Sequence, residues 1–362
     1  MHAISRAEVE KHLSTVNDAN TGLDLVSSGF VKDVGLDADR VTVDIVLGYP
    51  ADTVRAQVAS EVRTVLEADK RIASAAVNVI WKVAAHRVQG ELKPFDNMRN
   101  IIAVASGKGG VGKSTTAVNL ALGLAKDGAR VGILDADIYG PSIPRMMGAS
   151  GPPDTDGKHI IPKRAHGLQL MSIGFLVDEE TPMIWRGPMV TSALQQLLNE
   201  TNWEKLDYLV IDLPPGTGDI QLTLAQQVPV AGAVIVTTPQ DIALLDARKA
   251  LQMFRKVEVP VLGVVENMST HICTECGFEE AIFGSGGGKG MAADFDIPLL
   301  GQLPLAMEIR ASLDQGKPTM ISAADSRLAD TYLQFARRTA GALSQMPRNL
   351  KMSLPKIVIQ NA

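Results

Sequence analysis

A glycine-rich run, Gly107–Ser114, has the residue types and spacing that bind phosphate. Its sequence, GKGGVGKS, matches the pattern G-x-x-x-x-G-K-S/T. The apolar run Ile101–Ala105, which we expect to be a strand, precedes it, and a helical pattern follows from Ser114. In such a loop the backbone N–H groups turn toward phosphate oxygens, and the helix N-terminus adds partial positive charge. The predicted chemistry is the binding of a nucleoside triphosphate, ATP or a close analogue.

Two lysines in this loop have different expected roles. Lys113 is expected to reach the β and γ phosphates, while the hydroxyl of Ser114 is expected to bind Mg²⁺. Lys108 stands too early in the loop to bend back onto the same phosphates. We expect it to reach a nucleotide held by a facing subunit, as an arginine finger does, the alternative being a solvated side chain. The nucleotide-binding residues expected from the motif are Gly107, Lys108, Gly109, Gly110, Val111, Gly112, Lys113, Ser114 and Thr115.

Carboxylates stand at the ends of two predicted strands. Asp135 and Asp137 follow Val131–Leu134, and Asp212 follows Tyr208–Ile211. Ligands of open α/β sheets bind beyond the carboxyl ends of the strands, which is where these side chains fall. We expect Asp212 to be the second Mg²⁺ anchor, directly or through water, and Asp137 to orient the attacking water, with Asp135 as its competitor. The expected catalytic residues are therefore Lys108, Lys113 and Asp137.

The two cysteines of the chain form a second chemical feature. Cys273 and Cys276 stand in a Cys-x-x-Cys pattern followed by Gly277, which suits a tight metal-binding turn. A structural Zn²⁺ or an iron–sulfur cluster needs four ligands, whereas one chain offers two thiols, with His271 as one further donor. This count favours a metal centre on the two-fold axis of a homodimer, to which each chain gives both cysteines. Spacing alone leaves iron–sulfur, zinc and a redox dithiol open.

The segments of the chain differ in composition and hydrophobic pattern. Residues 1–85 are expected to form a small α+β domain, and the polar residues 86–98 a linker. Over residues 99–345 short apolar runs alternate with helical stretches, which predicts an α/β domain with a mainly parallel sheet flanked by helices. Residues 346–362 are expected to be a C-terminal tail.

The N-terminal segment has its own pattern and no catalytic constellation. Ser5 is expected to cap a first helix and Asp52 a second one. Alternating apolar residues predict strands over Val41–Leu47 and Val77–Val83.

Composition bounds the classes of function. The 362 residues are 46% hydrophobic and 21% charged, as in ordinary globular proteins. The formal net charge of −5 disfavours a nucleic-acid binder, and no apolar run approaches the ~18 residues that span a bilayer. We therefore expect no nucleic-acid partner and no membrane partner. The charged N-terminus has no apolar signal stretch, so the cytoplasm is the expected compartment.

Several motifs together resemble one known family. Lys108–Thr115 resembles the deviant Walker A motif of the MinD/ParA/nitrogenase-iron-protein superclass, P-loop ATPases that dimerise around two nucleotides. Asp135–Ser142, Asp212–Asp219, Asn267–Ser269 and the cysteine pair resemble the Mrp (ApbC-type) iron–sulfur cluster carrier ATPases, over roughly residues 99–345.

The N-terminal segment carries a second resemblance. Residues 1–85 resemble the PaaD-like (MIP18-type) assembly domain often fused ahead of Mrp. They depart from it at Tyr49–Ala51, where many such domains carry a cysteine.

The resemblance implies an ATPase that binds a [4Fe–4S] cluster at a homodimer interface and transfers it to apo iron–sulfur proteins, with cluster assembly scaffolds as further partners. Asn267 would hydrogen-bond the adenine edge. Hydrolysis is expected to be slow, because the full site assembles only in the closed dimer.

Two other functions of the superclass are the alternatives. One is a MinD/ParA-like ATP-dependent switch that positions itself on a membrane or on DNA. It should have a basic amphipathic C-terminal helix or a basic patch, and the sequence shows neither. The other is a nitrogenase-like reductase, which should have widely spaced single cysteines rather than Cys-x-x-Cys.

Overall fold

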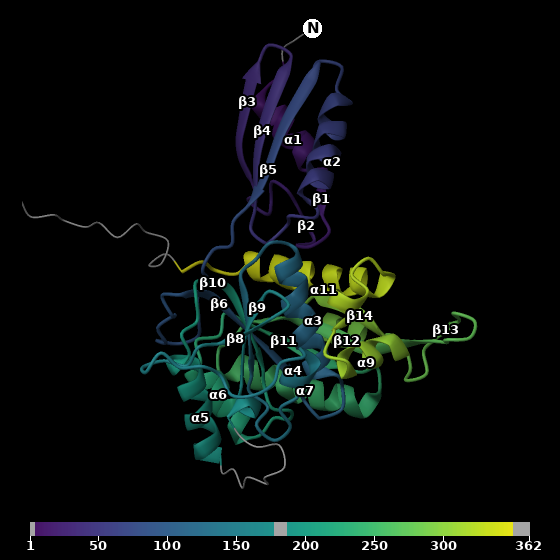
Figure 1. The fold of residues 1–362 in the computed structure, drawn as a ribbon. Coiled ribbons are helices and arrows are strands. Elements are labelled where there is room, and N and C mark those ends of the chain that lie inside the picture. Colours follow the sequence, from purple (N-terminus) through teal and green to yellow (C-terminus); the bar gives the residue numbers. More distant parts are fainter. Residues whose placement is uncertain (1–3, 177–186, 350–362) are drawn as a thin grey trace, which may run out of the picture.

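The computed structural model describes residues 4–176 and 187–349 of the chain (Figure 1). A mainly parallel sheet of nine strands forms the core of the larger part, in the order β13-β12-β11-β6-β10-β7-β9-β8, with β14 beside β12. Among the strand pairs of this sheet that the structure describes, only β8–β9 and β12–β13 are antiparallel. The strands are β6 (Met98–Ser106), β7 (Val131–Asp135), β8 (Lys163–Ala165), β9 (Leu168–Ser172), β10 (Leu206–Asp212), β11 (Gly232–Thr237), β12 (Val261–Ile272), β13 (Glu279–Glu280) and β14 (Leu299–Leu305).

Helices cover both faces of this sheet. α3 and α11 pack on each other over one face, and α5, α6 and α7 lie across the other (Figure 1). The central strands β10 and β11 are therefore buried along their whole length, which explains the apolar runs Tyr208–Ile211 and Ala233–Val236 within them. The helices are α3 (Lys113–Lys126), α4 (Ile143–Met146), α5 (Gly187–Glu200), α6 (Asp219–Gln227), α7 (Asp241–Lys256), α8 (Gly287–Phe295), α9 (Met307–Asp314), α10 (Thr319–Ser322) and α11 (Arg327–Ser344).

The fold class expected for this part is confirmed. The three apolar runs named above as strands, Ile101–Ala105, Val131–Leu134 and Tyr208–Ile211, lie in β6, β7 and β10. In the sheet Asp212 is in register with Asp135 on one side and with Val104 on the other. The carboxyl ends of β6, β7 and β10 therefore meet at one edge, as parallel strands require.

The smaller N-terminal part has a three-stranded sheet with two helices (Figure 1). The strand order is β3-β4-β5, in which β3 and β4 are antiparallel and β4 and β5 are parallel. The elements are α1 (Arg6–Leu13), β1 (Asn17–Asp18), β2 (Leu23–Asp24), β3 (Val31–Asp37), β4 (Arg40–Leu47), α2 (Arg55–Glu67) and β5 (Ser74–Trp81). Ser5 caps α1 in a capping box with Glu8, as predicted.

The prediction that Asp52 caps the second helix is wrong. The N-cap of α2 is Val54, and it makes no side-chain capping bond. The Asp52 carboxylate instead accepts a hydrogen bond from the indole N–H of Trp81, at 2.9 Å. A helix cap and an acceptor for a hydrogen bond from a distant residue can both be an Asp side chain. The local sequence therefore does not show which of the two roles Asp52 takes.

The two parts meet at the C-terminal end of α3. Asp127, the C-cap of α3, is almost fully buried and pairs with the guanidinium of Arg337 on α11, at 2.7 Å. The backbone N–H of Thr53 donates to the same carboxylate, and the backbone N–H of Asp52 donates to the carbonyl of Asp127. A carboxylate at a helix C-terminus is unfavourable by itself, so Arg337 and the small domain compensate for it. This buried pair ties the small domain to the helix that follows the glycine-rich loop.

The Arg337→Ala variant is expected to lower the free energy of unfolding by about 3–5 kcal/mol, because it leaves the Asp127 carboxylate buried without its countercharge. Arg327→Ala is the matched control on the same helix. Its ion pair with Glu279 is exposed and should be worth less than about 1 kcal/mol. Urea unfolding followed by circular dichroism measures both, and equal losses would contradict a stabilising role for the buried pair.

The polar segment expected to be a linker is held firmly in place. The buried Gln89 side chain donates to the carbonyls of Ala225 and Val228 and accepts from the N–H of Val230. Of the C-terminal tail, residues 350–362 lie outside the described residues. Among the helices that the structure describes, none is long and apolar enough to cross a bilayer.

Candidate functional site

The glycine-rich loop joins β6 to α3 as expected, and close contacts explain its glycines. A Cβ on Gly107 would lie 2.2 Å from the backbone carbonyl of Asp246 on α7. A Cβ on Gly112 would lie 2.1 Å from the Nδ2 atom of Asn267, and Gly112 is also left-handed, with a φ of 78°. The loop is therefore packed between α7 and Asn267, in the middle of β12, as it enters α3.

Lys113 lies in a buried group of carboxylates. Its Nζ atom is 2.6 Å from Oδ1 of Asp212 and 3.5 Å from Oδ2 of Asp137. Asp212 is fully buried, and its other oxygen, Oδ2, has no hydrogen-bond partner among the described residues. Three residues predicted from separate motifs thus meet at one point, at the ends of β7 and β10 and the start of α3.

Asp135 and Asp137 take different positions. Asp135 is fully buried, and its carboxylate accepts from the backbone N–H of Ile143 and the hydroxyl of Ser172, both at 3.1 Å. Asp137 lines a cavity of about 220 Å³ together with the glycine-rich loop and Pro215. Asp135 therefore holds the loop after β7, while Asp137 faces the space where phosphates would lie.

Burial raises the pKa of Asp135 well above its usual range, and the nearby Asp212 carboxylate adds to this shift. Burial, and then Asp212, also raise the pKa of Asp137, although Lys113 opposes the change. The native protein therefore binds more protons than the unfolded chain at mildly acidic pH, so these groups make stability fall as pH rises toward 8.

The Asp135→Asn variant is expected to show a flatter dependence of stability on pH than the wild type, because the amide cannot ionise. Between pH 5.5 and pH 8 its loss of unfolding free energy should be smaller by at least about 1.4 kcal/mol, the equivalent of one pKa unit. Urea unfolding of protein without nucleotide or metal measures this. Asp154→Asn, at an exposed loop position, is the control and should keep the wild-type slope. Parallel profiles for Asp135→Asn and the wild type would refute the expectation.

A second cavity of about 520 Å³ adjoins the first and shares Gly112, Thr115 and Met146 with it. Asn267, in the middle of β12, lines this second cavity. Its Nδ2 atom donates to the carbonyl of Val111 at 2.8 Å. That bond leaves the amide oxygen Oδ1 as the group that can accept from a ligand. The predicted adenine residue therefore lies beside the glycine-rich loop.

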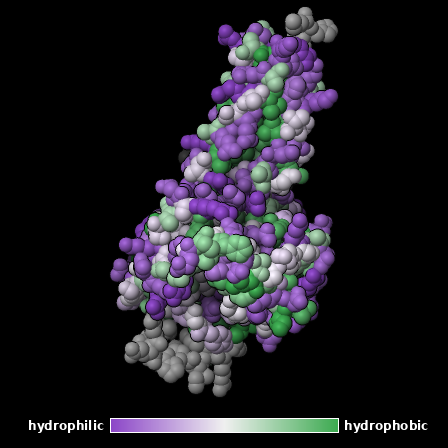
Figure 2. Space-filling view, turned by 90° about the vertical axis from the view of Figure 1, so that its right-hand side faces the viewer, coloured by the Kyte–Doolittle hydropathy of each residue, from purple (hydrophilic) through white to green (hydrophobic). Residues whose placement is uncertain are grey.

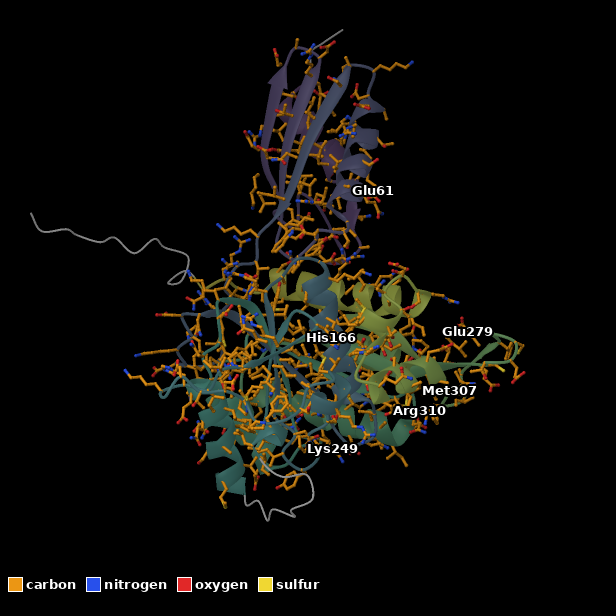
Figure 3. All side chains as sticks on the ribbon, in the orientation of Figure 1. Glu61, His166, Lys249, Glu279, Met307 and Arg310 are labelled. Atoms are coloured by element: carbon orange, nitrogen blue, oxygen red, sulfur yellow. The ribbon has the colours of Figure 1, made fainter. Side chains whose placement is uncertain are left out.

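The outer wall of the larger cavity was not predicted. It comes from α9, which contributes Ile309, Arg310 and Asp314. Figure 3 shows Arg310 and Met307 on this helix, on the side from which the β13 hairpin projects. These residues form no motif and stand about two hundred positions from the loop, so the sequence carries no signal for them.

Lys108 lines the smaller cavity and is half-buried. Its carbonyl accepts from the hydroxyl of Ser106, at 2.9 Å. Its ammonium group has no hydrogen bond or ion pair within the part of the chain that the structure describes. From this position the side chain can extend to a nucleotide held by a facing subunit or stay in solvent.

The residues expected to hold Mg²⁺ suit that ion. Mg²⁺ prefers oxygen ligands, and it is held in such sites by a few protein oxygens together with phosphate and water. The unpartnered Oδ2 of Asp212 supplies one such oxygen, and Ser114 lines the same cavity as Lys113. The orphaned buried oxygen fits a cation that binds with the nucleotide.

The cysteine pair lies at the tip of a hairpin that projects from the sheet (Figure 1). Cys276 is exposed and Cys273 half-buried. The backbone N–H of Cys273 donates to the carbonyl of Phe278, and the N–H of Gly277 donates to the carbonyl of Cys273, both at 2.9 Å. Backbone amides of Cys276 and Glu275 lower the pKa of the Cys273 thiol. The amides of this tight turn therefore favour the thiolate form of Cys273.

One chain does not complete a metal site here. Among the described residues no group of three or more His, Cys, Asp or Glu side chains is placed to hold a metal ion. The ring of His271, the additional donor considered above, lies 3.9 Å from the carboxylate of Glu280 across the hairpin. Around the thiols Phe278 and Ile282 are exposed apolar side chains, and apolar patches lie within the polar surface on this side of the molecule (Figure 2).

Comparison with known proteins gives family matches for both parts of the chain. The model of the ParA family, described as NUBPL iron-transfer P-loop NTPase, matches residues 97–340. The FeS_assembly_P model, described as iron-sulfur cluster assembly protein, matches residues 6–79.

Individual relatives cover much of the chain. The iron-sulfur cluster carrier protein of Pseudomonas fragi is 60% identical over 73% of this chain and 93% of its own length. The protein of the same name from Deinococcus radiodurans is 43% identical over 93% of this chain and 97% of its own. Among solved structures, a nucleotide-binding protein from Archaeoglobus fulgidus in complex with ADP matches with a TM-score of 0.55 and 39% identity, over 61% of this chain and 88% of that one.

Proposed function

Because the chain belongs to the ParA family of NUBPL-type iron-transfer P-loop NTPases, we propose that it is an ATP-hydrolysing carrier of iron–sulfur clusters. Two copies hold one [4Fe–4S] cluster between their cysteine pairs and pass it to apo iron–sulfur proteins. The observation that carries this proposal is that one strand, β12, supplies Asn267 beside the glycine-rich loop and ends at Ile272, directly before Cys273. The nucleotide site and the exposed thiols are thus parts of one structural unit.

ATP binds with its phosphates in the glycine-rich loop and its base in the larger cavity. Asn267 presents Oδ1 as an acceptor, which suits the exocyclic amino group of adenine and opposes the carbonyl oxygen of guanine. Two features support this placement: the two cavities adjoin at Gly112, and a relative of 39% identity was solved in complex with ADP.

Hydrolysis uses the carboxylate–lysine group at the strand ends. Asp137 faces the phosphate cavity and orients the attacking water, while Lys113 leaves its ion pair with Asp212 to bind the β and γ phosphates. Ser114 and Asp212 would hold Mg²⁺, which would supply positive charge to neutralise the phosphates. Lys108 of the facing copy completes the site, so that hydrolysis is slow and depends on the dimer.

Exposed apolar side chains beside the loop support a facing copy of the chain. Ile242 and Leu245 at the start of α7 are 70% and 59% exposed, and the backbone of the next residue, Asp246, packs against Gly107. Tyr139, two residues after Asp137, is 62% exposed. Apolar groups that gather at a functional edge mark an interaction site.

The bridging cluster follows from the count of thiolates. Each hairpin gives two, and a cluster or Zn²⁺ needs four. The family's iron-transfer description favours the iron–sulfur cluster over zinc. Such exposed thiols persist in a reducing compartment, so we place the carrier in the cytoplasm. Residues 1–85 act as the domain that meets partner proteins, and 99–345 as the ATPase.

The test is anaerobic purification followed by iron, sulfide and zinc analysis and an absorption spectrum. The proposal predicts about four irons per dimer and the charge-transfer absorption of thiolate-bound iron. Protein that binds stoichiometric zinc and takes up no iron during reconstitution would overturn it. A matched assay of ATP and GTP hydrolysis is expected to favour ATP.

A further inference from the structure

The strand that joins the nucleotide site to the thiols has an irregular middle. Asn267 of β12 pairs with Leu303 of β14, and the next pair is His271 with Leu305. β12 therefore advances four residues while β14 advances two, which leaves a bulge of two extra residues. Within it Met268 is left-handed, with a φ of 56°. A left-handed conformation is strained for a residue with a side chain, and such strain is kept only where surroundings impose it.

The bulge forms part of the wall of the larger cavity. Met268 lines it together with Asn267, Pro304 and Leu305. The Cε atom of Met268 also lies 3.7 Å from the position that a Cβ on Gly112 would take, so this side chain approaches the glycine-rich loop. A base that enters the cavity therefore meets the strained residue directly.

The strand is clamped before the bulge. Glu266 is fully buried, and its carboxylate accepts from the backbone N–H of Gly288 at the start of α8 and from the side-chain amide of Gln302 on β14. Fixed by bonds to two neighbouring elements, this part of β12 has little freedom to move.

The strand is held differently after the bulge. His271 still pairs with Leu305 of β14, His271 and Ile272 pair with β13, and the N–H of Cys273 donates to the carbonyl of Phe278, so backbone bonds connect the hairpin as far as the first thiol. An exposed ion pair between Glu279 and Arg327, at 2.7 Å, ties the hairpin to α11. Exposed ion pairs contribute little, so this tie yields easily.

We propose that Met268 is a hinge through which nucleotide in the larger cavity changes the position of the Cys273–Cys276 hairpin. A ligand shifts a two-state element only if it interacts differently with the two states. The base supplies that difference, because its site includes the hinge residue. This inference rests on the proposed function for the role of nucleotide and thiols, and it adds the element that couples them.

The test measures thiol reactivity in the full-length, reduced, cluster-free protein. Alkylation of the two cysteines by N-ethylmaleimide is followed with and without saturating ADP and Mg²⁺, at concentrations where light scattering shows one oligomeric state in both conditions. ADP places its base in the larger cavity but lacks the γ phosphate. In the wild type ADP should change the alkylation rate constant at least fivefold.

Glycine at the hinge should remove this response. Met268→Gly adopts the left-handed conformation without strain, so at an ADP concentration that a binding titration of this variant shows to be saturating, its alkylation rate should change less than twofold. Glu258→Gly is the matched control, because Glu258 is also left-handed, with a φ of 60°, and stands outside the bulge. It should respond as the wild type does.

Two outcomes would overturn the hinge: wild-type thiols that react equally with and without ADP, or a Met268→Gly protein that keeps the full response. Hydrogen exchange of the wild type gives a check that needs no variant, with ADP expected to change residues 268–273 and to leave 261–266 unchanged. The readouts use no iron, so a protein that never binds a cluster yet shows the response would refute the carrier function and keep the hinge.

Discussion

The Cys273→Ser, Cys276→Ser double variant is expected to be isolated without iron while it still hydrolyses ATP. Serine keeps the size of the side chain but removes the thiolates that iron–sulfur clusters require. Both cysteines lie on an outward hairpin and neither belongs to the apolar core, so the fold should remain intact. After anaerobic reconstitution the wild type should hold about four irons per dimer and the double variant close to none.

The single variants extend this result. Cys276→Ser alone leaves two thiolates per dimer, which is too few for a bridging cluster, so it should lose iron almost as completely as the double variant. Thr274→Ser, in the same turn, is the control and should retain wild-type iron. If the double variant keeps its iron, the thiols are not the ligands and the carrier proposal fails.

The Lys108→Ala variant is expected to bind ATP within a few-fold of the wild-type affinity but to hydrolyse it at least ~10³-fold more slowly. A charge supplied to the transferring phosphoryl group from a facing subunit is worth about that much in rate. The ammonium group has no partner among the described residues, so its loss removes no contact that holds the fold. Lys158→Ala, at an exposed loop position, is the control.

Mixing two inactive variants separates action across the interface from action within one subunit. Lys113→Ala cannot hold the phosphates of its own nucleotide, but it still carries Lys108. An equal mixture with Lys108→Ala should recover about a quarter of wild-type activity, because half of the pairs are mixed and each holds one complete site. A mixture as inactive as its components would show that Lys108 does not act on the facing nucleotide.

The phosphate-binding features followed from the sequence because their signals are local or follow a simple rule. Gly107–Ser114 is one continuous run, and the strand and helix beside it were visible as apolar patterns. Asp212 and Asp137 were expected near Lys113 because parallel strands bring their carboxyl ends to one edge. The structure places both within 3.5 Å of the Lys113 ammonium group.

Features that depend on contacts between distant segments did not follow from the sequence. Asp135 and Asp137 are two residues apart, and only the packing of Ile143 and Ser172 onto Asp135 assigns them different positions. The residues of α9 that line the larger cavity, Arg310 among them, form no sequence motif. Asp52 was expected to be a helix cap, and its acceptor role depends on where β5 places Trp81.

The sequence by itself determined the chemistry of this protein: a loop for phosphates, carboxylates at strand ends, and two thiols that need two further thiolates to complete a metal centre. Those depend on residue type and short spacing, which local backbone geometry converts directly into structure. Only the tertiary structure decided how these groups are connected. The strained Met268, the bulge around it and the clamp at Glu266 arise where β12, β14 and α8 pack together. Backbone conformation at such a place is set by neighbours that lie far away along the chain.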